Sequence, residues 1–402
     1  MSKPVAQYLL ISLPKSVGSE NSLSLWLEQS VNGGDVKLTK YQLPDFKVGT
    51  LDSLVEQSDE LAKIDTQLHS SIAKVLEIVA NVQAPAATAA GSSDTTSSAT
   101  LASAPLPTLK IDNKTVDQYF ETFQWNTRRY RLDKPTDELI KLISEEALNL
   151  DSDLKNAYSS YNSARSSLLA AQRKQTGDLT VKSLHDIVNK DDFVLGSEHL
   201  TTDILVIPKS LKKSFLDTYE SITPFVVPRS AHLITEDAEY YLYGVTLFKK
   251  YEQQFLAAAR EAKWIPREFN YSEDAINKMK NEYAEASREE ASLKNDLTRL
   301  SREAYSEITS AWIHIKLLRT FVESVLRYGL PPDFLCFFLK LKNEKAINKA
   351  KKDLTARFGY LGGNAFSTDK KGKVTKDNSL HEYASLVDQD YEPFVLYHIE
   401  LY

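Results

Sequence analysis

Histidine is the first residue type to test for chemistry, because acid–base catalysis and metal binding both use it often. The chain has seven histidines, scattered along its length, and no two of them have the spacing of metal ligands. They are His69, His185, His199, His232, His314, His381 and His398. His314 directly precedes an apolar position of a helical pattern, so we expect a structural histidine there rather than a base. The histidines therefore predict neither a metal site nor a general base.

Nucleophile and phosphate-binding patterns are equally sparse. The single cysteine, Cys336, lies in the apolar run 334–338, which predicts a buried structural thiol and excludes a disulfide within the chain. The glycine cluster at 359–364 lacks the Gly-Lys-Ser/Thr ending of a phosphate loop and is typical of a helix end. The paired carboxylates at 145–146 and 289–290 stand among lysines and arginines, as on a solvated helix flank. We predict no catalytic, cofactor-binding or metal-binding residue.

The whole-chain composition favours a folded protein with protein partners. With 402 residues and 42% hydrophobic residues, the chain is long enough for two or three domains. A net charge of −6 argues against nucleic-acid binding. No apolar run is long enough to span a membrane, and the N-terminus lacks a signal-peptide pattern, so we expect a cytoplasmic protein.

Three local segments have a distinct composition. The stretch 84–107 is rich in Ala, Ser, Thr and Pro and predicts a flexible surface loop. The aromatic residues between 119 and 130 are expected to form core, although a nucleic-acid stacking platform is the alternative. The stretch 340–376 is locally basic and could dock an acidic partner, an anionic membrane surface or actin, or simply be a solvated face.

The longest stretch without a helix breaker runs from Ser272 to Tyr328. Its apolar residues recur at alternating steps of three and four, with polar lapses at Glu290 and Glu307, which is the repeat of a coiled coil. The repeat positions are Ile276, Met279, Tyr283, Ala286, Glu290, Leu293, Leu297, Leu300, Ala304, Glu307, Ala311, Ile315, Leu318, Val322 and Val325. Such a helix is roughly 85 Å long, so its seam needs a partner helix.

The partner is predicted upstream, where the same alternation runs without a lapse. Its positions are Ile143, Ala147, Leu150, Leu154, Ala157, Tyr161, Ala164, Leu168 and Ala171. A chain that leaves along one helix and returns along another most simply packs them antiparallel. The predicted fold is therefore α+β, an elongated dumbbell whose two globular α+β ends are joined by a long antiparallel coiled coil. The neck is 138–176 with 264–328, the inserted head is 177–263, and the foot is 1–137 with 329–402.

The remaining elements are predicted from alternation and helical spacing. The predicted strands are 5–13, 35–43, 193–195, 204–207, 232–235, 240–248, 334–341 and 392–401. The predicted helices are 22–30, 51–82, 209–222, 249–263 and 345–358. Because a strand lies at each end of the chain, we expect the two ends to share one sheet.

Several segments closely resemble a known family. These are RKQTGDLTVKSLHDIVNKDDFVLGSEHLTT at 173–202, WIPREFNYSE at 264–273, AWIHIKLLRTFVESVLRYGLPPDF at 311–334, FGYLGGNAF at 358–366 and HEYASLVDQDYEPFVLY at 381–397. They are similar to the C subunit of the eukaryotic V-type proton ATPase, and most of all to its fungal members. The resemblance runs nearly end to end, although the tract 84–107 is longer than the family leads us to expect.

The resemblance implies a stator component without an active site or cofactor. In that family the head grips one peripheral stalk made of the E and G subunits, and the foot meets a second stalk and the cytosolic N-terminal domain of the a subunit. Family members assemble and disassemble reversibly in the pump that acidifies vacuoles. The resemblance also implies a location on the cytosolic face of vacuolar and endomembranes, with membrane association only through the complex, and possible actin binding.

Two other classes of function stay open. A coiled-coil cytoskeletal adaptor that binds actin is the alternative, and it would bind filaments rather than E–G heterodimers. An enzyme with a site hidden in the head is the third.

Overall fold

In the computed structural model, the described residues are 6–30, 37–83, 109–368, 374–376 and 392–401. The chain divides into two compact units. The first unit is Met1–Asn156 with Leu297–Tyr402, and the second is Ala157–Asp296. Two helices cross the division, α4 (Thr136–Thr176) and α7 (Glu273–Tyr328). The bounds of a separate head, neck and foot stay a prediction.

A four-stranded antiparallel sheet forms the centre of the first unit. Its order is β10 (Val395–Leu401), β1 (Ala6–Pro14), β7 (Phe334–Leu341) and β2 (Lys37–Tyr41). Strand β1 pairs with β10 along its length, with Ala6 opposite Leu401. The prediction that the two ends of the chain share one sheet is confirmed.

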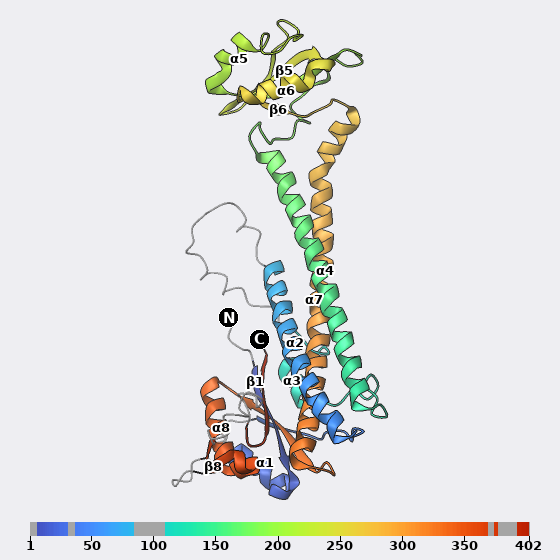
Figure 1. The fold of residues 1–402 in the computed structure, drawn as a ribbon, viewed down its shortest axis with the longest axis vertical. Helices are drawn as coiled ribbons and strands as arrows, with labels where there is room; N and C mark the ends of the chain where they lie inside the picture. The colour runs from blue at the N-terminus through green and yellow to red at the C-terminus, as the bar shows by residue number, and fades with distance from the viewer. Residues whose placement is uncertain (1–5, 31–36, 84–108, 369–373, 377–391, 402) are drawn as a thin grey trace. The chain divides into compact units, whose positions relative to one another are not determined.

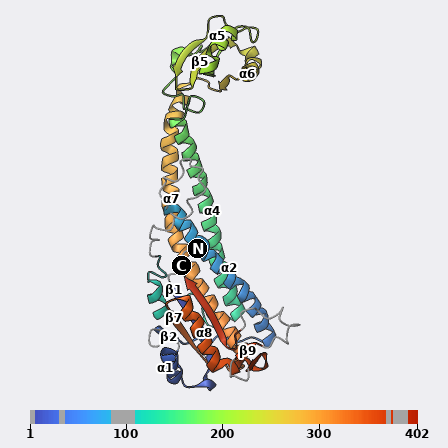
Figure 2. The same cartoon turned by 90° about the vertical axis from the view of Figure 1, so that its left-hand side faces the viewer.

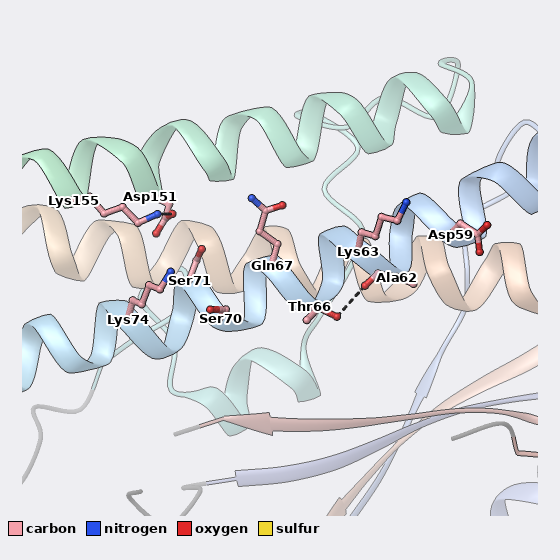
Figure 3. Close-up of a pocket in the computed structure, with 10 residues that line it drawn as sticks. All are labelled: Asp59, Ala62, Lys63, Thr66, Gln67, Ser70, Ser71, Lys74, Asp151 and Lys155. Atoms are coloured by element: carbon pink, nitrogen blue, oxygen red, sulfur yellow. Dashed lines mark hydrogen bonds and ion pairs between the residues drawn. The ribbon is translucent and has the colours of Figure 1, made fainter. Parts of the chain in front are cut away.

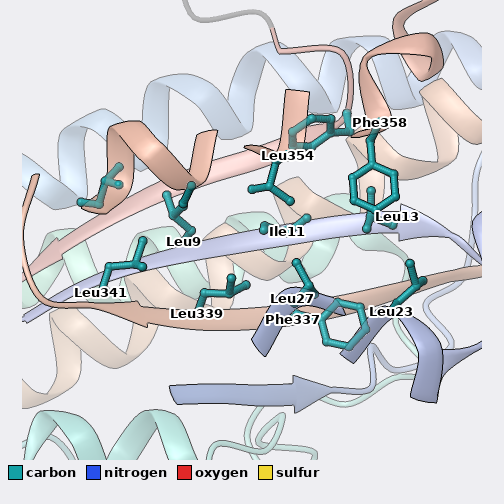
Figure 4. Close-up of a cluster of buried hydrophobic side chains, with 13 residues drawn as sticks. Leu9, Ile11, Leu13, Leu23, Leu27, Phe337, Leu339, Leu341, Leu354 and Phe358 are labelled. Carbon is teal, nitrogen blue, oxygen red and sulfur yellow. The ribbon is translucent and has the colours of Figure 1, made fainter. Parts of the chain in front are cut away.

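Helices α1 (Glu20–Ser30) and α8 (Glu344–Phe358) cover one face of this sheet (Figure 4). Alternate side chains of β1 point to this face, among them Leu9 and Ile11. Helix α8 meets them with an apolar stripe at steps of three and four. The stripe is Ile347, Ala350, Leu354 and Phe358. This spacing puts the four side chains on one side of the helix, so the opposite side of α8 faces solvent.

The other face of the sheet packs against α3 (Val116–Glu121) and the C-terminal part of α7, and α2 (Leu51–Gln83) packs on α7. Tyr8 stacks on Phe120 with ring centroids 4.1 Å apart. The hydroxyl of Ser324 donates to the Ser12 hydroxyl at 2.7 Å. Cys336 is buried here, and burial raises the pKa of its thiol to about 12, as expected of the predicted structural thiol. The aromatic residues Tyr119, Phe120, Phe123, Trp125 and Tyr130 are all buried, which confirms the core prediction.

The second unit has its own four-stranded antiparallel sheet, of which Figure 2 labels one strand, β5 (Tyr240–Phe248). Its order is β4 (His232–Glu236), β5, β3 (Leu200–Pro208) and β6 (Ile265–Arg267). Helices α5 (Lys212–Thr218) and α6 (Glu252–Glu261) cover one face around the buried residues Phe215, Phe255 and Trp264. Each unit therefore has an apolar core of its own.

Three local predictions in the second unit are wrong. Residues 193–195 form no strand, because the Phe193 ring instead packs between Phe269 at 5.6 Å and Tyr271 at 5.4 Å. The predicted helices 209–222 and 249–263 are shorter. Each opens with one 3₁₀ turn, η4 (Lys209–Leu211) and η5 (Lys249–Tyr251), before α5 and α6 begin. Strand β6 was not predicted, since it has only three residues and contains a proline.

Helices α4 and α7 run antiparallel in the second unit. Lys174 pairs with Glu282, and the hydroxyl of Tyr161 bonds Glu290. As the residue number falls along α4, that of its partner on α7 rises. The predicted seam of α4 is buried or half-buried at every position from Ile143 to Ala171. On α7, however, Tyr283 is 36% exposed, so the repeat overestimates how much of the early helix is covered.

The remaining described elements are short. They are η1 (Lys15–Val17), η3 (Lys190–Asp192), η6 (Gly359–Ala365), β8 (Phe366–Thr368) and β9 (Val374–Lys376). The glycine cluster thus follows α8 as a 3₁₀ helix. The predicted loop at 84–107 lies outside the described residues (Figure 1). Within the described ranges, no helix is long and apolar enough to cross a membrane.

Candidate functional site

In the described part of the chain, four places bring together polar or aromatic side chains that could have a role beyond packing. They are a buried charge cluster, a buried histidine and an open groove in the first unit, and an aromatic patch in the second. Among the described residues, no three His, Cys, Asp or Glu side chains lie together as a metal site would need. His381 lies outside the described residues.

The buried charge cluster joins α2 to α7. The Asp65 carboxylate is 4% exposed and accepts three hydrogen bonds from α7. Trp312 Nε1 donates to Oδ1 at 2.7 Å, while Lys316 Nζ and Arg319 Nη1 donate to Oδ2 at 2.8 and 2.7 Å. From β10, the Tyr397 ring lies 4.7 Å from the Arg319 guanidinium and 5.3 Å from Lys316 Nζ. One carboxylate thus ties α2 to two cations of α7 beside the sheet.

The electrostatics of the cluster depend on Asp65. Burial lowers the pKa of the Lys316 ammonium, and Asp65 acts in the opposite direction to hold the charge. A buried ion of either sign is costly without its partner. The cluster was not predicted from the sequence, although an aspartate next to Ile64 in the buried stripe of a helix is a signal that could have found it. The geometry of the cluster is that of a structural contact between α2 and α7 rather than of a reactive centre.

His314 lies in an aromatic box. Its Nδ1 lies 2.7 Å from the Ser310 carbonyl oxygen, and its Nε2 accepts the Asn126 N–H at 3.3 Å. The rings that contact it are Phe123, Trp125 and Tyr130, with centroids 4.8 to 5.1 Å away. Burial lowers the pKa of His314 to about 4. These contacts support the predicted structural histidine, neutral and bonded on both nitrogens.

We expect this histidine to make the first unit less stable in acid. The unfolded chain takes up a proton near pH 6.5, whereas folded His314 does not until about pH 4. Stability should therefore fall as pH drops from 6.5 to 4 and should not depend on His314 above that window. The loss attributable to His314 is roughly 3 kcal/mol. Urea unfolding of the native protein and of His314→Gln across this range measures it, because glutamine does not titrate. A constant stability difference between the two proteins would contradict the prediction.

An open groove of about 760 Å³ lies between α2 and α4 in the first unit (Figure 3). Its lining is polar, and the Thr66 hydroxyl donates a hydrogen bond to the Ala62 carbonyl oxygen at 3.0 Å. On the α4 side, Lys155 pairs with Asp151. The lining residues are Asp59, Ala62, Lys63, Thr66, Gln67, Ser70, Ser71, Lys74, Asp151 and Lys155. Mixed charges and hydroxyls on two helices suit a polar macromolecular surface better than a small apolar ligand.

An exposed aromatic patch lies at one end of the sheet in the second unit. Phe225 is 53% exposed, yet its φ is +67°, a conformation that bulky residues rarely adopt. Its ring stacks on Tyr251 with centroids 4.6 Å apart and meets Phe248 at 5.9 Å. Lys250 lies above the Tyr251 ring. Strain held at an exposed aromatic residue is typical of a binding surface rather than of packing.

In each of the carboxylate pairs 145–146 and 289–290, one glutamate has a structural partner. Glu146 on α4 bonds Arg129 Nε at 2.9 Å, and Arg129 also pairs with Glu307 on α7. Glu290 bonds Tyr161. The described contacts bring neither pair of glutamates together with a base or a nucleophile. The arrangement of these groups is that of ion pairs along helices.

Comparison with known proteins gives one consistent answer. The family model that describes the C subunit of the V-ATPase matches residues 8–395. The V-type proton ATPase C subunit of Saccharomyces cerevisiae is 48% identical over 399 residues, which cover 98% of this chain and 97% of that protein. The V-type proton ATPase C 1 subunit of Rattus norvegicus is 35% identical over 401 residues, which cover 98% of each chain. The C subunit of Manduca sexta is 33% identical over 400 residues, covering 99% of this chain and 98% of that one. The resemblance found in the sequence is thereby confirmed, and the chain belongs to the family of V-ATPase C subunits.

Proposed function

We propose that this chain is a non-catalytic stator subunit of the V-type proton ATPase. It joins the ATP-hydrolysing sector to the membrane-bound proton-conducting sector and leaves when the two separate. It acts on the cytosolic face of vacuolar and endomembranes. The observation that carries the proposal is the family relationship over almost the whole chain.

The two compact units support a bridging role. Each has its own antiparallel sheet and apolar core, and each presents a surface of a different kind. The second unit presents the Phe225 patch, and the first presents the polar groove between α2 and α4. Two separately folded units on one chain can bind two partners at once. Two weak contacts made together then give a high overall affinity, and neither contact has to be permanent.

The partners follow from the family. The predicted head, residues 177–263, grips one E–G stalk, and the foot meets a second E–G stalk and the N-terminal domain of the a subunit. In this scheme the Phe225 patch is the E–G contact of the head, because exposed aromatic residues dominate the energy of protein interfaces. Lys250 at its edge adds a positive charge for an acidic group of the stalk.

The test is binding of the purified protein to isolated E–G heterodimers, compared with Phe225→Gly. Glycine tolerates φ of +67°, so the substitution removes the ring and relieves strain with little net effect on stability. We expect affinity to fall about thirtyfold, since central aromatic residues of an interface commonly contribute about 2 kcal/mol.

The matched control is Leu233→Ala, which truncates a 48% exposed apolar side chain of β4 in the same unit. It should bind E–G as the native protein does. Failure of the native protein to bind E–G would overturn the proposed function. Equal binding by Phe225→Gly would leave the stator role standing and remove the patch from it.

A further inference from the structure

The solvent side of α8 carries a row of lysines. Lys345, Lys349 and Lys352 are exposed and recur at steps of four and three, so they lie on one face of the helix. The opposite face is anchored in the core through Leu354 and Phe358 (Figure 4). The three lysines, called the lysine stripe below, span about 10 Å along a helix that the core holds in place.

The charge of the stripe is not neutralised locally. Within the described ranges, no ion pair includes Lys345, Lys349 or Lys352. Helix α8 as a whole carries five cationic and two acidic residues, although the chain has a net charge of −6. A positive stripe on an acidic protein provides local attraction to an anionic surface.

The residue types favour a fluid anionic surface over a protein. Arginine is enriched and lysine depleted in protein interfaces, because the planar guanidinium fits fixed carboxylates. The stripe contains only lysine, and the one arginine of α8, Arg357, instead stacks 4.3 Å from the Trp26 ring. Just beyond the helix, Tyr360 is 66% exposed, and tyrosine is a common residue at the membrane–water interface. Lysines on flexible stems can follow mobile headgroups that offer no fixed geometry.

We propose that the lysine stripe of α8 binds anionic lipid headgroups of the membrane directly. The proposal goes beyond the stator role and departs from the expectation that the chain meets the membrane only through the complex. Each lysine beside an anionic bilayer changes the binding constant by about fivefold. Three of them give a weak, salt-sensitive contact that can orient the protein without preventing its release.

The test uses the full chain and phosphatidylcholine vesicles with and without phosphatidylserine, at low and high salt, in a flotation assay. We expect binding that requires phosphatidylserine and falls with salt. Lys345→Gln/Lys349→Gln/Lys352→Gln should lose about a hundredfold in affinity at low salt. Lys141→Gln/Lys278→Gln/Lys280→Gln removes the same charge from exposed positions of α4 and α7 that lie outside the groove and should bind as the native protein does.

Three results would overturn the proposal. The native protein could show no phosphatidylserine-dependent binding, or the two triple variants could lose binding equally. Third, neither the native protein nor the stripe variant could bind vesicles, while the native protein binds polyglutamate and the stripe variant does not. That result would assign the stripe to an acidic polypeptide instead. Unchanged unfolding midpoints establish that the variants are folded. Unchanged E–G binding by the stripe variant separates this inference from the stator proposal.

Discussion

Asp65→Asn is expected to destabilise the first unit by about 3–5 kcal/mol, among the largest effects of any single side chain. The substitution keeps the size of the side chain and can keep the bond from Trp312 Nε1. It removes the charge that faces Lys316 and Arg319, both of which donate to Oδ2. The buried Lys316 and the half-buried Arg319 then repel each other across a neutral amide. Hydrogen exchange of α7 amides in the first unit is the appropriate measurement, because it reports the opening of the region that contains the cluster.

The control for this prediction is Lys316→Met. It removes one cation and leaves Asp65 bonded to Arg319, so we expect it to cost clearly less than Asp65→Asn. The variant with both Asp65→Asn and Lys316→Met should lose less stability than the sum of the two single losses. The reason is that Lys316→Met removes a cation that Asp65→Asn leaves without its carboxylate. Independent, additive effects would show that the three groups do not form an electrostatic unit.

Leu297→Pro is expected to abolish coupled ATP-driven proton pumping while binding to isolated partners persists. Leu297 is 1% exposed in the interior of α7, at the point where the division between the two units falls. Proline there removes a backbone hydrogen bond and clashes with the preceding turn, at a cost of roughly 3 kcal/mol or more. If the stator acts by holding two partners at a fixed separation, loss of helix stiffness lowers the effective concentration of the second contact. Proton pumping by vacuolar membranes from cells that lack the native protein measures the effect.

Leu297→Ala is the matched control for the helix. It removes the same buried side chain and keeps the backbone hydrogen bond, so it should lower stability but retain pumping. A folded Leu297→Pro protein that restores normal pumping would show that stiffness of α7 is not needed. Loss of pumping by both variants would point to the side-chain contacts of Leu297 instead.

Local pattern was enough to predict much of the fold. The absence of Pro and Gly from 272–328 predicted α7 to within a residue, and the apolar run 334–341 predicted β7 without error. The buried face of α4 could be predicted because α4 and α7 pack through apolar residues at alternating steps of three and four, and this spacing is visible in the sequence. The family was likewise determined by the sequence, since its segments recur along the whole chain.

Tertiary structure decided what the repeat could not. From Ala311 to Leu318 every residue of α7 is buried, because α2, the aromatic segment 123–130 and strand β10 contact the helix there, while the seam residue Tyr283 stays exposed. The cluster of Asp65 with Lys316 joins residues 251 positions apart, and no local pattern carries such a pairing. The left-handed conformation of Phe225 and the stacking of its ring on Tyr251, 26 positions away, are likewise tertiary features that no local pattern indicates. Periodicity records which face of an element is apolar, but the identity of its neighbours and the burial of its charges depend on which elements the chain brings together.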